Sequence, residues 1–144
     1  MIGGRKMDRK LSITSYDLPG IGGEINTANY TILLLNYLPR LSPDTVMDMQ
    51  CHTETDESFV LLTGKAVLFT SDGEGKPGKL DATVMENGKI YTVPRGMWHT
   101  QVMTEDAKIL LVENSGTVVD NSPRFPLNDS QKKFLCETGR KLLR

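Results

Sequence analysis

Short apolar segments, separated by Gly, Pro, Asn and Asp, run through most of the chain. Segments of this length bounded by turn residues are typical of β-strands. We predict nine strands, at Leu11–Tyr16, Tyr30–Leu38, Thr45–His52, Ser58–Leu62, Lys65–Thr70, Asp81–Met85, Lys89–Val93, Thr100–Thr104 and Ile109–Glu113. Closing these strands into a barrel, or packing them as two sheets, gives them one apolar interior and removes open edges, so the pattern predicts an all-β, sandwich-like barrel.

Three turn sequences support this arrangement. The stretch "SDGEGKPGK" (71–79) predicts a flexible hairpin loop, and "ENGK" (86–89) carries the Asn-Gly signal of a tight hairpin. In "PRG" (94–96), Pro94 is placed to shape a turn just before a predicted strand.

The C-terminal end has a different period. From Asp129 to Leu143 the apolar residues fall near helical spacing, and the segment Asn128–Ser130 supplies capping residues, so a short helix packed on the barrel is expected despite the cost of Gly139. The predicted organisation is therefore a flexible leader at 1–10, a barrel at 11–126 and a C-terminal helix at 127–144.

Composition and charge narrow the class of protein. The chain has 144 residues, is 38% hydrophobic, and balances 17 Lys and Arg against 18 Asp and Glu for a net charge of −1. One core is expected at this size, and the balanced charge argues against nucleic acid or a membrane surface as a partner. No apolar run is long enough for a membrane helix or a signal core, so we expect a cytoplasmic protein, with Cys51 and Cys136 as free thiols.

The first histidine lies in the stretch "DTVMDMQCH". Side chains alternate across a strand, so Asp48, Gln50 and His52 share one face. The opposite face carries an apolar stripe of Met47, Met49 and Cys51. If no other strand covers it, this stripe is a candidate contact for a homodimer.

A carboxylate and the second histidine are placed to join His52. Glu57 follows the tight "TETD" turn and can return towards His52 from the next strand, and His99 heads a strand directly after the "PRG" turn. Two imidazoles and a carboxylate are a ligand set typical of a divalent transition metal, and iron, manganese, zinc, nickel and copper all remain open. The alternative is that His52 and Glu57 only pair with each other.

These spacings resemble the two motifs of the cupin family, G(X)5HXH(X)3-4E(X)6G and G(X)5PXG(X)2H(X)3N. His52, Glu57 and Gly64 fit the end of the first motif, and the segment Gly88–His99 fits the second without a gap. The resemblance covers roughly residues 45–115. It implies a double-stranded β-helix, or jelly-roll, barrel of the small single-domain cupins, with a short C-terminal helix added here.

The resemblance also implies that His52, Glu57 and His99 are metal ligands. Gln50 stands where the family has its first histidine, and it is either a weaker fourth ligand or a hydrogen-bond partner of a ligand. The opening glycine of the first motif is missing, and Met103 replaces the final asparagine of the second.

The pocket walls follow from the same strand faces. Residues that share a face with Glu57 or His99 are expected to line the pocket: Phe59, Leu61, Gln101 and Met103. Glu113, near the end of an apolar strand, is either a pocket acid or a solvated strand end.

The leading hypothesis is a metal-dependent enzyme of the isomerase, lyase or dioxygenase type, acting on a polar organic small molecule such as a sugar or a carboxylic acid. The alternative is a non-catalytic ligand-binding or sensor module with an empty or vestigial metal site. A structural or storage role is a third option, which predicts no metal and no open pocket.

Overall fold

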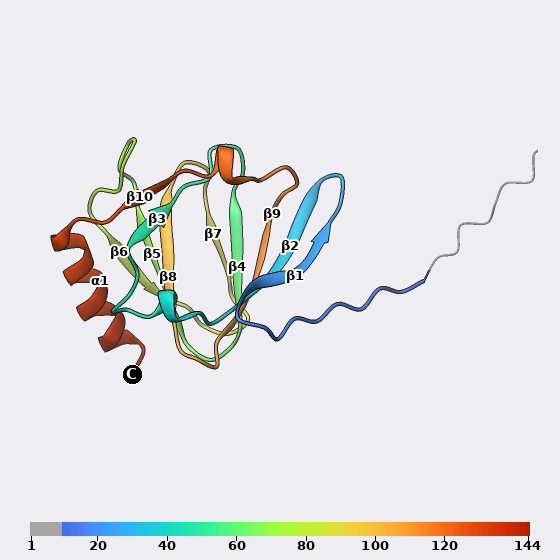
Figure 1. Ribbon diagram of the computed structural model, residues 1–144, viewed down its shortest axis with the longest axis horizontal. Helices are drawn as coiled ribbons and strands as arrows, with labels where there is room; N and C mark the ends of the chain where they lie inside the picture. Colours follow the sequence, from blue (N-terminus) through green and yellow to red (C-terminus); the bar gives the residue numbers. More distant parts are fainter. Residues whose placement is uncertain (1–9) are drawn as a thin grey trace, which may run out of the picture.

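Two antiparallel sheets of five strands each form a barrel in the computed structural model, which describes residues 10–144 (Figure 1). One sheet has the order β1-β2-β9-β4-β7 and the other β10-β3-β8-β5-β6. The strands are β1 (Gly20–Asn26), β2 (Tyr30–Asn36), β3 (Asp48–Gln50), β4 (Glu57–Thr63), β5 (Ala66–Ser71), β6 (Asp81–Val84), β7 (Ile90–Val93), β8 (Trp98–Met103), β9 (Lys108–Asn114) and β10 (Arg124–Pro126). Two 3-10 turns, η1 (Pro39–Leu41) and η2 (Val119–Asn121), and one helix, α1 (Asp129–Leu142), complete the elements. The predicted all-β jelly-roll barrel with a C-terminal helix is confirmed.

The interior between the two sheets is an apolar core. Its buried residues are Leu35, Leu41, Phe59, Leu61, Ala66, Leu68, Met85, Val93, Met103, Ala107, Ile109 and Leu111. Those that lie in strands come from inward-facing positions in both sheets, whereas Leu41, Met85 and Ala107 lie in η1 and in connecting loops.

A second core lies outside the β10-β3-β8-β5-β6 sheet, where α1 covers it (Figure 1). In β5, Ala66 and Leu68 belong to the interior core, whereas Val67 and Phe69 belong to the second core with Leu135 of α1. β5 is therefore buried on both faces, which explains why its sequence is a continuous apolar run rather than an alternating one.

Helix α1 begins with a reciprocal cap. The Gln131 backbone N–H donates to the Asn128 side chain at 2.8 Å, and the Asn128 N–H donates to the Gln131 side chain at 2.9 Å. A Cβ on Gly139 would lie 3.2 Å from Pro43 and Val102 side-chain atoms. The glycine thus allows a close approach of the helix to β8, which offsets its low helix propensity.

Two predicted strands need correction, and two observed strands were not predicted. Leu11–Tyr16 is not a strand in the structure, and residues 42–47 form a turn and loop, so that the strand predicted at Thr45–His52 shrinks to β3. β1 was missed because its glycines and its bulge between Gly22 and Ile25 mask the alternation, and β10 because it is three residues long and ends in proline.

The "ENGK" prediction is half right. A turn does form there, with the Lys89 N–H donating to the Glu86 carbonyl at 3.3 Å and Gly88 at φ +80°. The strands it joins, β6 and β7, lie in different sheets, so it is a crossover and not a hairpin. The "SDGEGKPGK" hairpin is confirmed, since it joins the paired strands β5 and β6.

The apolar stripe is not an exposed surface. Met49 and Cys51 are buried in the second core with Leu135 of α1, and only Met47 is exposed, at 59%. The homodimer prediction therefore loses the feature on which it was based. Cys51 and Cys136 are free thiols, as expected.

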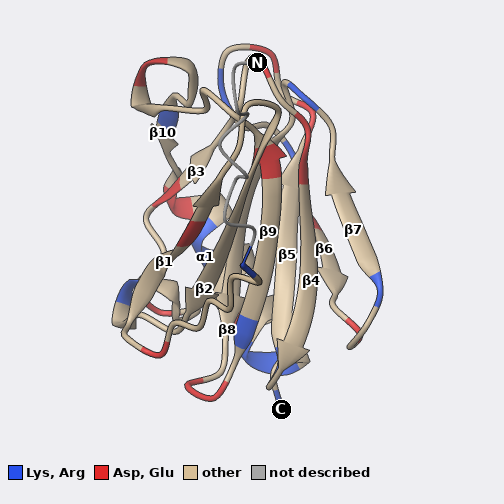
Figure 2. Ribbon diagram, turned by 90° about the vertical axis from the view of Figure 1, so that its right-hand side faces the viewer, with Lys and Arg blue, Asp and Glu red and all other residues tan. Residues whose placement is uncertain are grey.

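Residues 1–9 of the predicted leader lie outside the described residues. Among residues 10–144, no helix has the length and apolarity to span a membrane. Basic residues lie among acidic ones on the face seen in Figure 2, and neither sign dominates it.

Candidate metal centre

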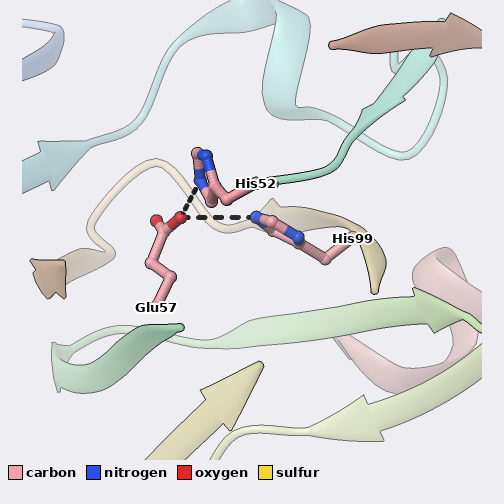
Figure 3. A group of neighbouring side chains, drawn as sticks. All are labelled: His52, Glu57 and His99. Atoms are coloured by element: carbon pink, nitrogen blue, oxygen red, sulfur yellow. Dashed lines mark ion pairs between the residues drawn. The ribbon is translucent and has the colours of Figure 1, made fainter. Parts of the chain in front are cut away.

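Three buried side chains from separate segments converge inside one end of the barrel. His52 follows β3, Glu57 begins β4 and His99 lies in β8, and Figure 3 shows both imidazoles directed at the same carboxylate oxygen. The candidate ligand atoms all lie within 4.8 Å of one another. Glu57 Oε2 is in close contact with His52 Nε2 and 3.5 Å from His99 Nε2. The centre therefore joins the two sheets, because Glu57 belongs to one and His99 to the other.

Backbone hydrogen bonds hold the two histidine-bearing segments together. The Gly96 N–H donates to the His52 carbonyl at 2.8 Å, and the Arg95 N–H donates to Asp56 Oδ1 at 2.7 Å. The Met97 N–H closes the predicted turn on Pro94 at 3.1 Å, with Gly96 at φ +85°. The "PRG" turn thus fixes the position of His99 relative to the loop that carries His52.

The hydrogen bonds of the two rings leave both Nε2 atoms facing the carboxylate. His99 Nδ1 lies 3.1 Å from the Met97 carbonyl, which can only accept, so Nδ1 carries the proton. His52 Nδ1 lies 2.7 Å from Ser122 Oγ, which is 3.4 Å from the side-chain oxygen of Asn121. A hydroxyl that donates to Asn121 accepts from His52 Nδ1–H, which frees Nε2. An imidazole oriented by a bond at its other nitrogen is the usual arrangement of a metal-binding histidine.

Two buried atoms of this cluster lack hydrogen-bond partners. Among the described residues, His52 Nε2 and Glu57 Oε2 are the buried side-chain atoms with none. A buried lone pair costs free energy unless it meets a proton or a cation. A divalent ion between the carboxylate and the two Nε2 atoms would satisfy all three groups, so the donor set fits a metal.

The electrostatics favour an ionised Glu57. Burial opposes its charge, but its interactions with His52 and His99 outweigh burial and lower its pKa to about 2. Burial also opposes protonation of His52, yet the neighbouring carboxylates Glu57 and Glu113 raise its pKa overall. Without a metal, the cluster therefore favours a proton shared between His52 and Glu57.

A second carboxylate lies beside the cluster. Glu113 Oε2 is 3.8 Å from His52 Nε2, and the Glu113 side chain is only 11% exposed. Burial, followed by the charge of Glu57, raises the pKa of Glu113 to about 7. Of the two readings open from the sequence, the structure favours the pocket acid.

Two cavities open onto the centre from different sides. The narrower one, of about 160 Å³, reaches Glu57 and His99 past η1 and β3, and Gln50 and Gln101 lie on its wall. The wider one, of about 450 Å³, reaches His52 and Glu113 past residues 117–123. Gln50 borders both cavities. This position suits either a fourth metal ligand or a hydrogen-bond partner of a candidate ligand.

The predicted lining residues divide into two groups. Gln101 lies on the wall of the narrower cavity. The other three are almost fully buried in the interior core and do not border either cavity: Phe59, Leu61 and Met103. Phe59 meets the His99 ring edge-on at 5.8 Å, and so packs against a candidate ligand rather than lining a cavity.

Three further polar residues lie at the centre or border its cavities: Glu113, which the sequence left open between a pocket acid and a solvated strand end, and Ser122 and Arg124, which it did not single out. Glu113 had a sequence signal, because it continues the inward face of Ile109 and Leu111 in β9. Ser122 and Arg124 had none, since Ser122 precedes and Arg124 begins the three-residue strand β10, whose position depends on its pairing with β3.

Sequence comparison gives no relative: no protein-family model matches the chain, and no curated protein is significantly similar. Solved structures do match. CapF, in a complex with the inhibitor 3-isopropenyl-tropolone, has a TM-score of 0.52 at 12% identity, covering 77% of this chain and 33% of CapF.

Two further structures are similar at lower scores. Hydroquinone 1,2-dioxygenase from Sphingomonas sp. TTNP3 has a TM-score of 0.49 at 15% identity, covering 65% of this chain and 64% of the enzyme. A cupin-2 domain containing protein from Shewanella frigidimarina has a TM-score of 0.43 at 20% identity, covering 62% of this chain and 74% of that one. At such identities the similarity concerns the fold.

Proposed function

The chain has the cupin fold, and from this premise we propose that it is a metal-dependent enzyme in which His52, Glu57 and His99 hold one divalent transition metal ion. Its substrate is a small polar organic molecule, and its reaction is of the isomerase, lyase or dioxygenase type. Gln50 is either a fourth ligand or a hydrogen-bond donor to a ligand.

The observation that carries this proposal is the contact between two buried atoms, His52 Nε2 and Glu57 Oε2, neither of which has a hydrogen-bond partner in the described part of the chain. Both point at the place where His99 Nε2 also points. A structural ion pair would need only one histidine, whereas the arrangement presents two neutral donors and one anionic donor to a common point.

When bound there, a divalent ion supplies Lewis acidity to an oxygen of the substrate. The chain's own residues supply the rest. Ser122 and the Met97 carbonyl keep the two imidazoles oriented. Gln50 and Gln101 offer amide donors and acceptors to a molecule in the narrower cavity. The apolar core behind Phe59 keeps water from the rear of the centre.

Metal content tests this proposal directly. Protein purified without chelators, and apo-protein reconstituted separately with Fe²⁺, Mn²⁺, Zn²⁺, Ni²⁺ and Cu²⁺, is analysed by elemental mass spectrometry. We expect close to one ion per chain, and an anomalous diffraction signal between the three side chains. Protein that binds none of these ions would instead support the non-catalytic alternative, with a protonated His52 paired to Glu57.

Variants separate the ligands from their neighbours. His99→Ala and Glu57→Gln each remove a donor, and we expect metal occupancy to fall at least about tenfold for both. Gln101→Ala is the matched control, because Gln101 lies two residues along β8 on the same face as His99. Occupancy in the control should be unchanged, and equal losses in all three variants would contradict the ligand assignment.

A further inference from the structure

Arg124 lies in the same row of residues as the candidate ligands. In the pairing of β10 with β3, Arg124 is opposite Gln50, and in the pairing of β3 with β8, Gln50 is opposite His99. Residues directly opposite each other in antiparallel strands place their side chains on the same face. Arg124 therefore faces the cavities, and it borders both the narrower and the wider one.

The guanidinium of Arg124 is bound by Asp48, but this contact occupies only some of its N–H groups. Its Nη1 donates to Asp48 Oδ1 at 3.1 Å, and the side chain remains 45% exposed. Among the described residues, Asp48 is its one hydrogen-bonding partner, so further N–H groups of the planar fork are available to a ligand. Such a fork matches the two oxygens of a carboxylate.

A second arginine borders the narrower cavity, which would gain positive charge with a bound metal ion. Arg40, in η1, also borders it, and within residues 10–144 the acids on its wall are Asp48 and Glu57. The two arginines balance these two acids, so that a divalent ion leaves the cavity with a positive charge. A cavity of this kind favours an anionic ligand over a neutral one.

The size of the cavity limits the ligand. Its volume is about 160 Å³, close to that of an engineered cavity of ~150 Å³ that holds benzene. A molecule with only a few carbon atoms fits the narrower cavity, whereas a sugar phosphate or a disaccharide would have to extend into the wider one.

We propose that the substrate is a small carboxylic acid with a second oxygen donor, whose carboxylate is bound by Arg124 while its other oxygen faces the metal centre. This inference rests on the proposed function, and it narrows the substrate class from polar organic molecules to short hydroxy or oxo acids. Arg124 is the specificity-determining residue, and Asp48 is the positioning residue that holds it.

The test compares two probes of the same shape. Lactate and its neutral amide, lactamide, are titrated calorimetrically into protein loaded with Zn²⁺, with elemental analysis of each sample. We expect wild-type protein to bind lactate at least about tenfold more tightly than lactamide. Arg124→Met should reduce lactate affinity about tenfold to a hundredfold, in line with the loss of a charged hydrogen-bonded pair, and should leave metal occupancy unchanged.

The control is Arg140→Met, which removes an exposed arginine paired with Asp44, outside the residues that border either cavity. Its lactate affinity should equal that of the wild type. Equal binding of lactate and lactamide, a loss confined to Arg40→Met, or tighter binding of inorganic phosphate than of lactate would each overturn the inference. Absence of metal from the wild-type protein would instead overturn the proposed function, so the two failures are distinguishable.

Discussion

Glu57 and Glu113 lie directly opposite each other on the neighbouring strands β4 and β9, and both border the wider cavity. Opposed residues of antiparallel strands have Cβ atoms about 4.5–5.5 Å apart, where two like charges repel each other. His52, within contact of both carboxylates, reduces this repulsion only in part. A proton or a cation shared by the pair would remove the remaining repulsion.

This pair gives a pH prediction for the metal-free protein. The pKa of Glu113 is about 7 in the folded protein against an ordinary value of 4.5, so between these values the unfolded chain binds fewer protons. The contribution of Glu113 to the free energy of unfolding must then fall as pH rises from about 4.5 through 7. Glu113→Gln removes this loss, so the variant should gain stability relative to wild type between pH 5 and pH 8, as measured by urea unfolding.

The matched control is Glu105→Gln, an exposed acid in the loop between β8 and β9. Its stability difference from wild type should be the same at both pH values. A Glu113→Gln variant that behaves like this control would contradict the assigned environment of Glu113.

Ser122 should matter to metal binding although it is not a ligand. Its hydroxyl is 2.7 Å from His52 Nδ1 and fixes the orientation of the ring. We expect Ser122→Ala to weaken Zn²⁺ affinity about 10–100-fold, the usual effect of removing such a partner, as measured by competition with a fluorescent chelator. Ser58→Ala, which removes an exposed hydroxyl bonded to Thr92, should not change the affinity.

Two glycines with nearly the same backbone angle should respond differently to alanine. Gly64 has φ +71° and Gly75 φ +69°, but a Cβ on Gly64 would lie 2.5 Å from the Ala107 backbone, whereas one on Gly75 meets nothing within 4 Å. Both variants lose about 1 kcal/mol to the left-handed conformation. Gly64→Ala should lose about 1–3 kcal/mol more through overpacking, and equal losses in thermal unfolding would refute the close contact.

The second core predicts a large effect at Leu135. This residue is fully buried between α1 and the outer face of the sheet. Leu135→Ala should lower the free energy of unfolding by about 2–5 kcal/mol, as measured by urea denaturation. Lys133→Ala, on the exposed side of the same helix, should change it by less than about 0.5 kcal/mol. A small effect at Leu135 would mean that α1 is not packed as the structure shows.

The long strands were predictable because their patterns are local. β4, β5, β8 and β9 combine apolar runs with clear turn residues, and each lies within two residues of its predicted range. The convergence of His52, Glu57 and His99 was predictable for a different reason: the spacings match motifs that already encode the barrel's register. No physical rule for single strands would have brought His99 to Glu57.

The features that were not predicted depend on pairing between segments that lie far apart in the sequence. β1 pairs with β2 through a bulge, and its sequence, with three glycines, contains no pattern that identifies β2 as its partner. The Asn-Gly turn at 87–88 forms as expected, but turn chemistry does not specify in which sheet the next strand lies. Arg124 reaches the site only because β10 pairs with a three-residue β3. Whether Met49 is buried or exposed likewise depends on where α1 packs.

The position of Glu57 and His99 in different sheets has a practical consequence. Whatever ties these two residues together stabilises the closed barrel as a whole, and its free energy of binding adds to that of folding. An ion at a hundred times its dissociation constant adds about 2.7 kcal/mol, which for a domain of this size raises the melting temperature by about 5–10 °C. A melting curve recorded against a panel of ions and acids can therefore rank the natural occupants of the barrel before any reaction is known.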